Sequence, residues 1–514
     1  MADLYSQLPA EIQQTILQVL VDGGEKKYLA AALRVNKSWF ANCVPILYRT
    51  LPDLRAIFGA VGSPNLDTYI SNICHIVFEG GCYTEDLKKV KDTSLELPNL
   101  RFISVEPPFV PGRTKRNYEE EYSLEPIFPL LRPSVIAFSC IGGILTRELL
   151  TALKEKCPHL EKLELKFMRS RNVRNIDEDY LCQWFRDMPS VHSVSIFNLG
   201  NISNGHRDEL IEKLVSDNLV SDLLDRPLKT LGLECYPEEL GRLGGKEIVY
   251  SLRDLRVVLR QNIFGSIPRF RHLDNLHVRI DGLLTEALFP SIASLVHLKS
   301  LRIIFGVLPT LKTEDIMLLS NLHALKRLEI RSSQKGDMSY KDKDVFLPIE
   351  VSESFDEDCF HQLVSSFLNM RHLFLFFDWA PDSFRVVKSV ATACPNVEYL
   401  GLGYNIDIHE SLMKEKKPVL PCLKRFAPVR KIVMDVSGGQ FRKTRRNIEE
   451  FIVTVSRFII QAFPTVHHIA LSPDYRKNFL FDPEEWPGEG EPILLDLDTV
   501  PDFETYHEGA NKWW

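Results

Sequence analysis

Apolar residues recur along the chain in a short motif, which we number L1-x2-x3-L4-x5-L6-x7 because positions 1, 4 and 6 are apolar. Clear copies are "CPHLEKLEL" (157–165), "LVHLKSLRI" (295–303) and "LHALKRLEI" (322–330). In twelve of thirteen copies both L4 and L6 are apolar, and only Phe426/Pro428 departs. Alternation with period two predicts a short strand that buries one side. The chain therefore contains a series of similar half-buried strands.

Helix-like spacing of apolar residues follows many of these strands. It occurs in residues 144–156, 358–368, 382–393 and 448–463. Neither a half-buried strand nor an amphipathic helix covers its apolar side alone, so successive strand–helix units must stack and share one core. We therefore expect an α/β array of repeats.

The motif is similar to the L-x-x-L-x-L pattern of leucine-rich repeats. This resemblance implies a solenoid with its strands on the concave side. The L1 positions, from Ile73 to Val466, recur about every 33 residues, whereas regular leucine-rich units have roughly 20–29. The long intervals contain the polar stretches 106–126 and 332–358, which we interpret as surface loops. We therefore predict an irregular, twisted solenoid over residues 56–472.

The N-terminal residues 7–21, "QLPAEIQQTILQVLV", have a wide apolar face. On a helical wheel this face spans roughly 220°, whereas a surface helix needs about 100°. Short helices are also expected over residues 28–35 and 36–43, the latter carrying Trp39. Three short helices bury too little surface to be stable alone. The N-terminal residues therefore favour a docking module with two contact faces.

Leu8-Pro9, Ile12, Ile16, Leu20, Leu29, Val35 and Trp39 resemble the F-box pattern, and the following "ILYRTL" is similar to many fungal F-box proteins. The resemblance implies an all-α F-box over residues 1–55 that binds the Skp-type adaptor of a cullin–RING (SCF) ubiquitin ligase. The implied adaptor contacts are Leu8, Pro9, Ile12, Leu17, Leu20 and Trp39. The insertion "VDGGEKKY" lengthens the first connection relative to the family. An alternative is a helical cap that seals one end of the solenoid.

Composition and charge exclude several classes of protein. With 62 Lys+Arg against 69 Asp+Glu, the net charge of −7 gives no general attraction to nucleic acid or to an anionic membrane. The ten cysteines include no CxxC pair, which favours buried, reduced thiols. The start lacks a signal-peptide pattern, and no apolar run is long enough to span a bilayer. We expect a cytoplasmic or nuclear protein.

Motifs for catalysis, metals and cofactors are missing. The sequence has no GxxxxGK[ST], GxSxG or HExxH and no paired cysteine–histidine spacing. "GLGYNI" (401–406) lacks the third glycine of a dinucleotide loop and overlaps a repeat strand. We therefore expect no enzymatic activity, no cofactor and no metal.

The predicted concave face carries a group of arginines. Alternation turns x3, x5 and x7 outward, which places Arg279, Arg302, Arg327 and Arg331 on neighbouring strands about 4.8 Å apart. Phe374, Phe376 and Tyr399 follow on the next strands and are large side chains of the kind that interfaces favour. We predict that this face binds an acidic or phosphorylated segment of a target protein. The alternative is an ordinary charged surface.

Residues 473–514 form the predicted third region, an acidic C-terminal tail that is either a solvated end or docks on the last repeats through Trp486 and "ILLDL". Together the three regions predict a substrate-recognition subunit of an SCF-type ligase that presents targets for ubiquitination and proteasomal degradation. Two alternatives remain open from the sequence. One is a leucine-rich scaffold or GTPase regulator without a ligase role, and the other is an F-box protein that assembles with the adaptor without turnover of a target.

Overall fold

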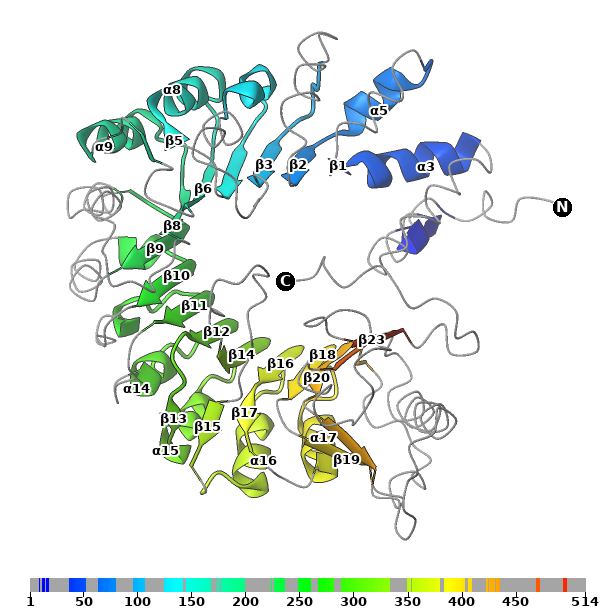
Figure 1. The fold of residues 1–514 in the computed structure, drawn as a ribbon, viewed down its shortest axis with the longest axis vertical. Helices are drawn as coiled ribbons and strands as arrows, with labels where there is room; N and C mark the ends of the chain where they lie inside the picture. Colours follow the sequence, from blue (N-terminus) through cyan, green and yellow to red (C-terminus); the bar gives the residue numbers. More distant parts are fainter. Residues whose placement is uncertain are drawn as a thin grey trace, which may run out of the picture. The chain divides into compact units, whose positions relative to one another are not determined.

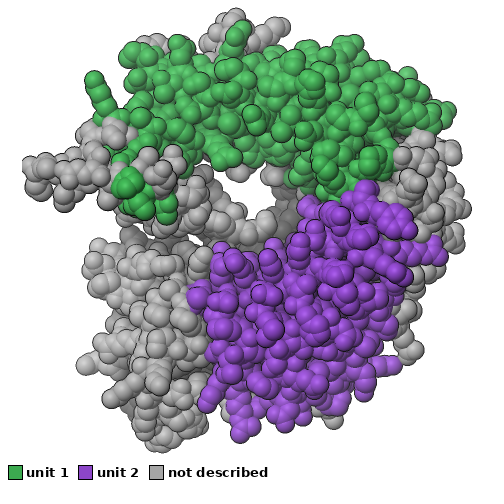
Figure 2. Space-filling view, turned by 180° about the vertical axis from the view of Figure 1, so that it is seen from behind, with its two compact units in different colours: residues 1–234 green, residues 235–514 purple. Residues whose placement is uncertain are grey.

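The structure is a computed structural model. It describes residues 9, 12–13, 15–17, 37–51, 63–79, 96–106, 124–141, 145–167, 173–174, 176, 178–198, 223, 226–235, 248–259, 267–281, 288–332, 349–352, 354–379, 383–402, 405–408, 422–423, 425–429, 431–434, 468–471 and 493–496. The chain divides into two compact units, Met1–Glu234 and Cys235–Trp514, which are coloured separately in Figure 2.

Unit 1 is built on a parallel sheet whose strands follow each other in chain order. The strands are β1 (Thr50–Leu51), β2 (His75–Glu79), β3 (Phe102–Glu106), β4 (Ala137–Ile141), β6 (Lys162–Phe167), β8 (Ser193–Asn198) and β9 (Thr230–Cys235). Helices lie on one face of this sheet (Figure 1). They are α5 (Leu66–Asn72), the 3₁₀ helix η3 (Glu125–Leu130), α8 (Arg147–Lys156) and α9 (Glu178–Asp187). Helix α3 (Lys37–Tyr48) precedes the sheet, and β5 (Leu145–Thr146) pairs with β7 (Val173–Arg174).

Unit 2 repeats the arrangement. Its main sheet contains β10 (Asp254–Leu259), β11 (Asn275–Ile280), β12 (Ser300–Phe305), β14 (Arg327–Ser332), β16 (His372–Leu375), β18 (Tyr399–Leu402), β20 (Arg425–Val429) and β22 (His468–Leu471), all parallel, and then β23 (Ile493–Asp496), which is antiparallel to β22. On one face lie α14 (Leu288–Ala293), α15 (Thr313–Met317), α16 (Glu357–Ser365) and α17 (Ser383–Ala393), as Figure 1 shows. The 3₁₀ helices η5 (Ile267–Arg269) and η6 (Leu318–Asn321) contact α14, and α13 (Ile248–Ser251) precedes β10. Short strands β13 (Thr310–Leu311), β15 (Ile349–Val351) and β17 (Phe377–Asp378) form a second sheet, and β19 (Asn405–Ile408) pairs with β21 (Lys431–Met434).

The motif explains this architecture. L1, L4 and L6 are almost completely buried in each described copy, as in Leu298, Leu301 and Ile303. In most described copies the backbone N–H of L1 bonds to the carbonyl three residues earlier, and that earlier residue is apolar and buried too, as in Leu295; Val135, which bonds to Arg132, and Leu228, which bonds to Arg226, depart. The same tight turn therefore precedes most strands and gives them a common direction. The L4 and L6 side chains of neighbouring strands are consequently in register, as in Leu276, Leu301 and Leu328. The strand–helix stack of both units is leucine-rich-repeat-like, as the pattern predicts.

Cysteine occupies that earlier turn position twice. Cys157 and Cys394 are buried, and the Cys394 Sγ lies 3.4 Å from the Val364 carbonyl and 3.3 Å from the Phe367 carbonyl. Burial raises the pKa of Cys394 to about 12 and that of Cys157 to about 11. The prediction of buried thiols is confirmed for these two residues.

Most predicted elements match the described ones, with shifted boundaries. All thirteen L4/L6 pairs lie in strands, including Phe426/Pro428 in β20. The expected helices become α8, α16 and α17, whereas 448–463 lies outside the described residues. The helix expected over 36–43 extends to Tyr48. Within the predicted tail, Ile493–Asp496 forms β23. The boundaries proposed at residues 55 and 472 stay predictions.

One repeat was missed by the sequence analysis. Leu252, Leu255 and Val257 are all buried and form the copy that contains β10. It lies between Leu228 and Leu273, one of the widest apparent intervals of the series. The spacing of these three residues fits the motif fully, so the signal was present in the sequence. The array is consequently more regular here than the sequence analysis predicts.

Candidate interaction surfaces

The described positions between residues 12 and 17 are helical and pack against α3. The Pro9 carbonyl accepts hydrogen bonds from the backbone N–H of Ile12 at 3.0 Å and of Gln13 at 3.1 Å, which starts the turn. Leu17 and Cys43 are fully buried together, with Trp39, Ile46 and Leu47 packed around them. The Asn42 side-chain amide donates to the buried Gln13. One side of this N-terminal segment is thus a small core.

A neighbouring side of the segment, about 100° around the helix from Gln13 and Leu17, remains exposed. Ile12 and Ile16 are 47% and 37% exposed. They are four residues apart, so they lie on the same side of the helix. Pro9 is exposed as well. Isoleucine is among the residues most often fully buried, which makes two exposed isoleucines on one face an informative observation.

The implied adaptor contacts separate into four groups. Pro9 and Ile12 are exposed, and Trp39 is half-buried against the small core. Leu17 is fully buried, so the expectation that it contacts an adaptor is corrected: its side chain is occupied by Cys43 and α3. Leu8 and Leu20 lie outside the described residues. Ile16, which belongs to the resembling pattern, takes the exposed place beside Ile12.

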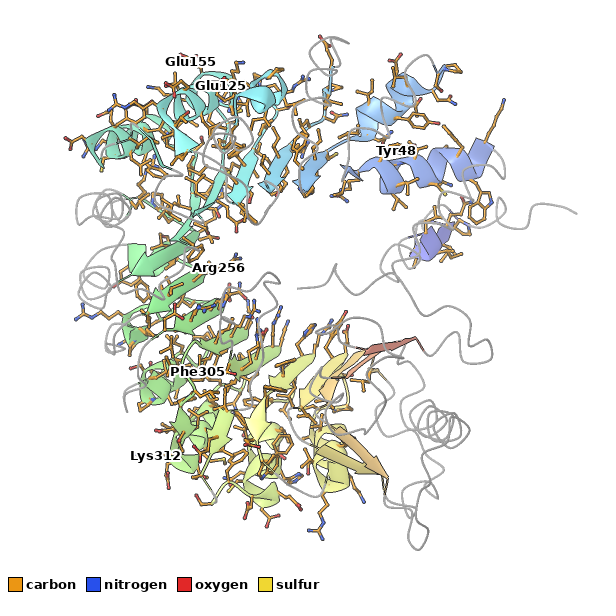
Figure 3. The ribbon with its side chains drawn as sticks, viewed as in Figure 1. Tyr48, Glu125, Glu155, Arg256, Phe305 and Lys312 are labelled. Carbon is orange, nitrogen blue, oxygen red and sulfur yellow. The ribbon has the colours of Figure 1, made fainter. Side chains whose placement is uncertain are left out.

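Helix α3 also contacts the first repeat of unit 1. Tyr48, labelled in Figure 3, stacks on Tyr69 of α5 with ring centroids 4.7 Å apart. Phe40 lies 6.0 Å from the same tyrosine. The N-terminal segment is therefore joined to the repeats by aromatic packing through α3.

The second surface is the face of the unit 2 sheet that lies opposite α14–α17, which we call the helix-free face. In Figure 3, Arg256 lies on this side and Lys312 on the side of the helices. Strand register places Arg256, His277, Arg302, Glu329, Phe374 and Gly401 in one row across β10, β11, β12, β14, β16 and β18. Parallel neighbours in register bring these side chains about 4.8 Å apart.

Glu329 is the centre of the charged part of this row. Its Oε1 accepts from the Nε of Arg302 at 2.9 Å and from the Nε of Arg331 at 2.8 Å, and its Oε2 accepts from Arg327 at 2.9 Å. Burial raises the pKa of Glu329, but the arginines, led by Arg302 and Arg331, outweigh burial and the pKa is lowered. We call these four residues the arginine cluster. Three guanidinium groups share one carboxylate, so the cluster keeps an excess of positive charge.

Two of the predicted target-binding residues are corrected. Arg331 is 4% exposed and Phe376 is 2% exposed, so neither side chain is available to a partner. Period-two alternation predicted the correct side of the sheet for Arg331 but not its burial. The Arg331 guanidinium is hydrogen-bonded to the buried carboxylate of Glu329 and is therefore buried with it. Arg279 points outward but is paired with Asp281 at 2.7 Å. The predicted positive area is thus interrupted by carboxylates.

The remaining predicted residues are partly exposed. The side chains of Arg302 and Arg327 are 31% and 46% exposed. Phe374 and Tyr399 are partly exposed, and Tyr399 stacks on His372 with centroids 3.9 Å apart. The structure therefore brings arginines and aromatic rings together on adjoining strands of the helix-free face.

Sequence reasoning missed Arg256 as part of the same row and did not count His277 among the target-binding residues. Arg256 belongs to the overlooked repeat and pairs with Asp254 at 3.2 Å. His277 lies between Arg256 and Arg302, and its Nε2 has no hydrogen-bond partner among the described residues. Burial first, and then Arg302, lower the pKa of His277 to about 3. The ring is therefore neutral at neutral pH and adds no positive charge.

Among the residues that the structure describes, no group of three or more His, Cys, Asp or Glu side chains could hold a metal ion. In the same residues no helix has both the length and the apolar composition needed to cross a membrane.

Comparison with known proteins gives distant similarities of structure. No family model and no curated protein sequence matches the chain. Similar solved chains come from the Rad7 and Elc1 complex in yeast (15% identity, 83% of this chain and 96% of that chain covered, TM-score 0.38), from an internalin, InlF, of Listeria monocytogenes (12%, 75% and 94%, 0.33) and from the TLR13–ssRNA13 complex (12%, 72% and 58%, 0.29). None of these matches assigns a role to a residue of this chain.

Proposed function

We propose that the chain is the substrate-recognition subunit of an SCF-type ubiquitin ligase. Its N-terminal segment docks a Skp-type adaptor, and through it a cullin, while the repeats hold the target protein. The chain acts in the cytoplasm or nucleus and makes or breaks no bond itself. It raises the concentration of the target near the ubiquitin-conjugating enzyme, which is a contribution of proximity.

The observation that carries this proposal is the exposed pair Ile12 and Ile16 above a core made by Leu17 and Cys43. Covering the part of each isoleucine that is still exposed, 47% for Ile12 and 37% for Ile16, stabilises a complex by about 1 kcal/mol per residue. Nothing in the local core requires these two side chains to be isoleucine, because Leu17 already fills the contact with α3. A separate subunit that covers them explains why they are apolar. The resemblance of these residues to the F-box pattern names that subunit as the adaptor.

The test is co-purification of the full chain with a Skp-type adaptor and cullin. We expect the wild-type chain to retain both, and the double variant Ile12→Ser/Ile16→Ser to lose them. Both side chains are exposed, so the substitutions should change the free energy of unfolding by no more than about 0.5 kcal/mol each. Loss of adaptor with an unchanged melting temperature separates a lost contact from a lost fold.

Val296 provides a matched control, because it is an apolar residue in unit 2 with 50% exposure. Val296→Ser should leave adaptor binding intact. Adaptor binding that survives Ile12→Ser/Ile16→Ser, or a wild-type chain that never retains the adaptor, would contradict the proposal. Accumulation of a target protein in cells that carry the double variant would then connect docking with degradation.

A second candidate function follows from the packing of α3 on α5. The stacked Tyr48 and Tyr69 allow the N-terminal segment to serve as a cap of the repeat array in a binding scaffold without a ligase role. A cap of this kind would make Tyr48→Ala lower the melting temperature, whereas Ile12→Ser/Ile16→Ser would leave it unchanged and no adaptor would be bound even by the wild-type chain. Retention of the adaptor by the wild-type chain therefore distinguishes docking from capping.

A further inference from the structure

The helix-free face of unit 2 has a charged half and an aromatic half that meet in one row of side chains. Arg302, Glu329 and Phe374 are in register on β12, β14 and β16. Gly401 follows Phe374 on β18 and contributes no side chain to the row. A glycine at this place leaves the side of the Phe374 ring toward β18 without a neighbour from its own row. The row therefore passes from charge to an aromatic surface within a few strands.

The charged half keeps hydrogen-bond donors. Arg302 uses its Nε for Glu329, and Arg327 uses one terminal nitrogen for the same carboxylate. Guanidinium has five N–H donors, and no other described residue accepts from either side chain. Both side chains are partly exposed, at 31% and 46%. Their remaining donors can meet a carboxylate or a phosphate from outside the chain.

Glu329 makes the two arginines a preorganised pair. It holds Arg302 on one oxygen and Arg327 on the other, so both guanidinium groups stand beside one carboxylate. The third arginine, Arg331, is buried beneath and adds a second excess positive charge close by. A long side chain that is already fixed loses less conformational freedom when it binds. An acidic group therefore meets fixed donors in a positive field.

The aromatic half offers apolar contact area. Phe374 is partly exposed, and His372 and Tyr399 stack beside it at the amino-terminal ends of β16 and β18. Aromatic side chains with part of their surface exposed are typical anchors of protein interfaces. Charge and aromatic surface together match a peptide segment better than a small anion, which would use only the arginines.

We propose that this face binds an extended, acidic segment of a protein, with one anionic side chain on Arg302 and Arg327 and one large apolar side chain on Phe374 and Tyr399. The inference deepens the proposed function, on which it rests, because it states the chemistry of the target. Two strand spacings separate Arg302 from Phe374, which is about 10 Å. An extended chain rises about 3.3 Å per residue. The acidic and the apolar residue are therefore about three positions apart.

The experiment is selection of a displayed library of random decapeptides on the purified full chain. We expect the enriched peptides to share an acidic residue about three positions from a large apolar one. Binding of an enriched, fluorescein-labelled peptide should weaken about tenfold in Arg302→Gln/Arg327→Gln and in Phe374→Ala. It should also weaken as salt is added, because the arginines are exposed. A phosphoserine at the acidic position tests phosphate against carboxylate at the same donors.

Matched substitutions serve as controls. Arg385→Gln changes an arginine of α17 whose side chain is 73% exposed, and Leu368→Ala changes an apolar residue that is 69% exposed. Both should bind the peptide as the wild type does. Circular dichroism checks that each variant is folded. Should Arg302→Gln/Arg327→Gln be unfolded, the single variant Arg327→Gln takes its place, because Arg327 is the most exposed member of the arginine cluster.

The inference is overturned if no peptide is enriched, if the enriched peptides show no acidic preference, or if the arginine and phenylalanine variants bind with wild-type affinity. Its failure is separable from that of the proposed function. A chain that retains the adaptor but no acidic peptide contradicts this inference alone. A chain that binds the peptide through Arg302 and Arg327 but never the adaptor contradicts the ligase role alone.

Discussion

At the residue scale, Glu329 stabilises the unit 2 sheet more than its place in the sequence motif indicates. Its side chain is 9% exposed and neutralises Arg331, which is 5% exposed. Removing one partner from a buried ion pair leaves the other charge uncompensated in a medium of low dielectric constant. The cluster is therefore a structural feature first, and its exposed arginines become available to a partner only because Glu329 holds them.

Glu329→Gln should lower the free energy of unfolding by about 3 kcal/mol, which urea denaturation would measure. Glu398→Gln is the control: Glu398 pairs with Arg371, whose side chain is 63% exposed, so its loss should be below about 1 kcal/mol. Equal losses in the two variants would show that the arginine cluster adds nothing beyond a surface ion pair.

Two partly buried histidines, His75 and His277, make the stability of the chain depend on pH. Burial lowers the pKa of His75 to about 4, and burial with Arg302 lowers that of His277 to about 3, against 6.5 for a free histidine. The unfolded chain therefore binds protons below pH 6.5 that the folded chain does not. The free energy of unfolding therefore loses nothing to these two histidines above pH 6.5, and it falls as the pH decreases from 6.5 toward their lowered pKa values.

We expect each histidine to contribute up to about 1.4 kcal/mol per pH unit to this loss. His277→Gln should reduce the slope of unfolding free energy between pH 6 and 5, as measured by urea denaturation. At pH 8 His277 is uncharged in both the folded and the unfolded chain. The difference in unfolding free energy between His277→Gln and the wild type at that pH therefore gives the effect of the substitution itself. A slope equal to that of the wild type would show that His277 titrates normally in the folded chain.

At the scale of single elements, α8 shows how a local signal sets a boundary. The expected helix over 144–156 begins at Arg147, because Thr146 is extended and its side chain accepts the backbone N–H of Leu149 at 3.2 Å. Threonine is a favoured N-cap for this reason. Leu145 and Thr146 form β5 instead of a first helical turn.

Thr146→Ala should cost about 1 kcal/mol of stability by removing this cap, while Thr146→Ser should retain most of it. Thermal unfolding of the two variants would measure the difference. An alanine variant that is as stable as the serine variant would contradict a role for the hydroxyl in α8.

The strands were predictable because each copy of the motif carries its own pattern. Alternation places Leu301 and Ile303 inside, and the L1 anchors align neighbouring copies without any structure. That same alignment sets Arg302 opposite Glu329. The ion pair could therefore have been deduced from register, but the sequence reasoning treated each arginine separately. The exposure of Arg331 could not be deduced, because it depends on how three side chains share one carboxylate in space.

The N-terminal segment shows the same division. The width of its apolar face predicts two contacts, and the structure divides them between a core at Leu17 and an exposed pair at Ile12 and Ile16. Which isoleucine or leucine takes which role depends on the rotation of the helix on α3. Helical periodicity alone does not fix that rotation.

At the scale of the whole molecule, β23 completes the unit 2 sheet. It adds an antiparallel strand to β22, with Ile469 opposite Leu495 and Leu471 opposite Ile493. Without β23, β22 would be the open edge of the sheet, and open edges invite pairing with other chains. With β23 present, the outer strand of the described sheet ends in Asp496 and lies in an acidic sequence, and charged residues on an edge strand disfavour such pairing.

A chain that ends at residue 481 should therefore self-associate more than the full chain, and sedimentation velocity would detect this. A chain that ends at residue 498 keeps β23 and is the matched control, which should stay like the wild type. Identical behaviour of the two truncated chains would show that β23 does not protect the edge.

The reversed direction of β23 also bears on how such an array can lengthen. Every other described strand of the unit 2 main sheet runs parallel to its neighbours, so a copy of the motif inserted between two of them would meet the same parallel pairing on both sides. A copy inserted between β22 and β23 would have to pair with one parallel and one antiparallel neighbour. Gain of a repeat within the parallel part of the array therefore disturbs the hydrogen-bonding pattern least.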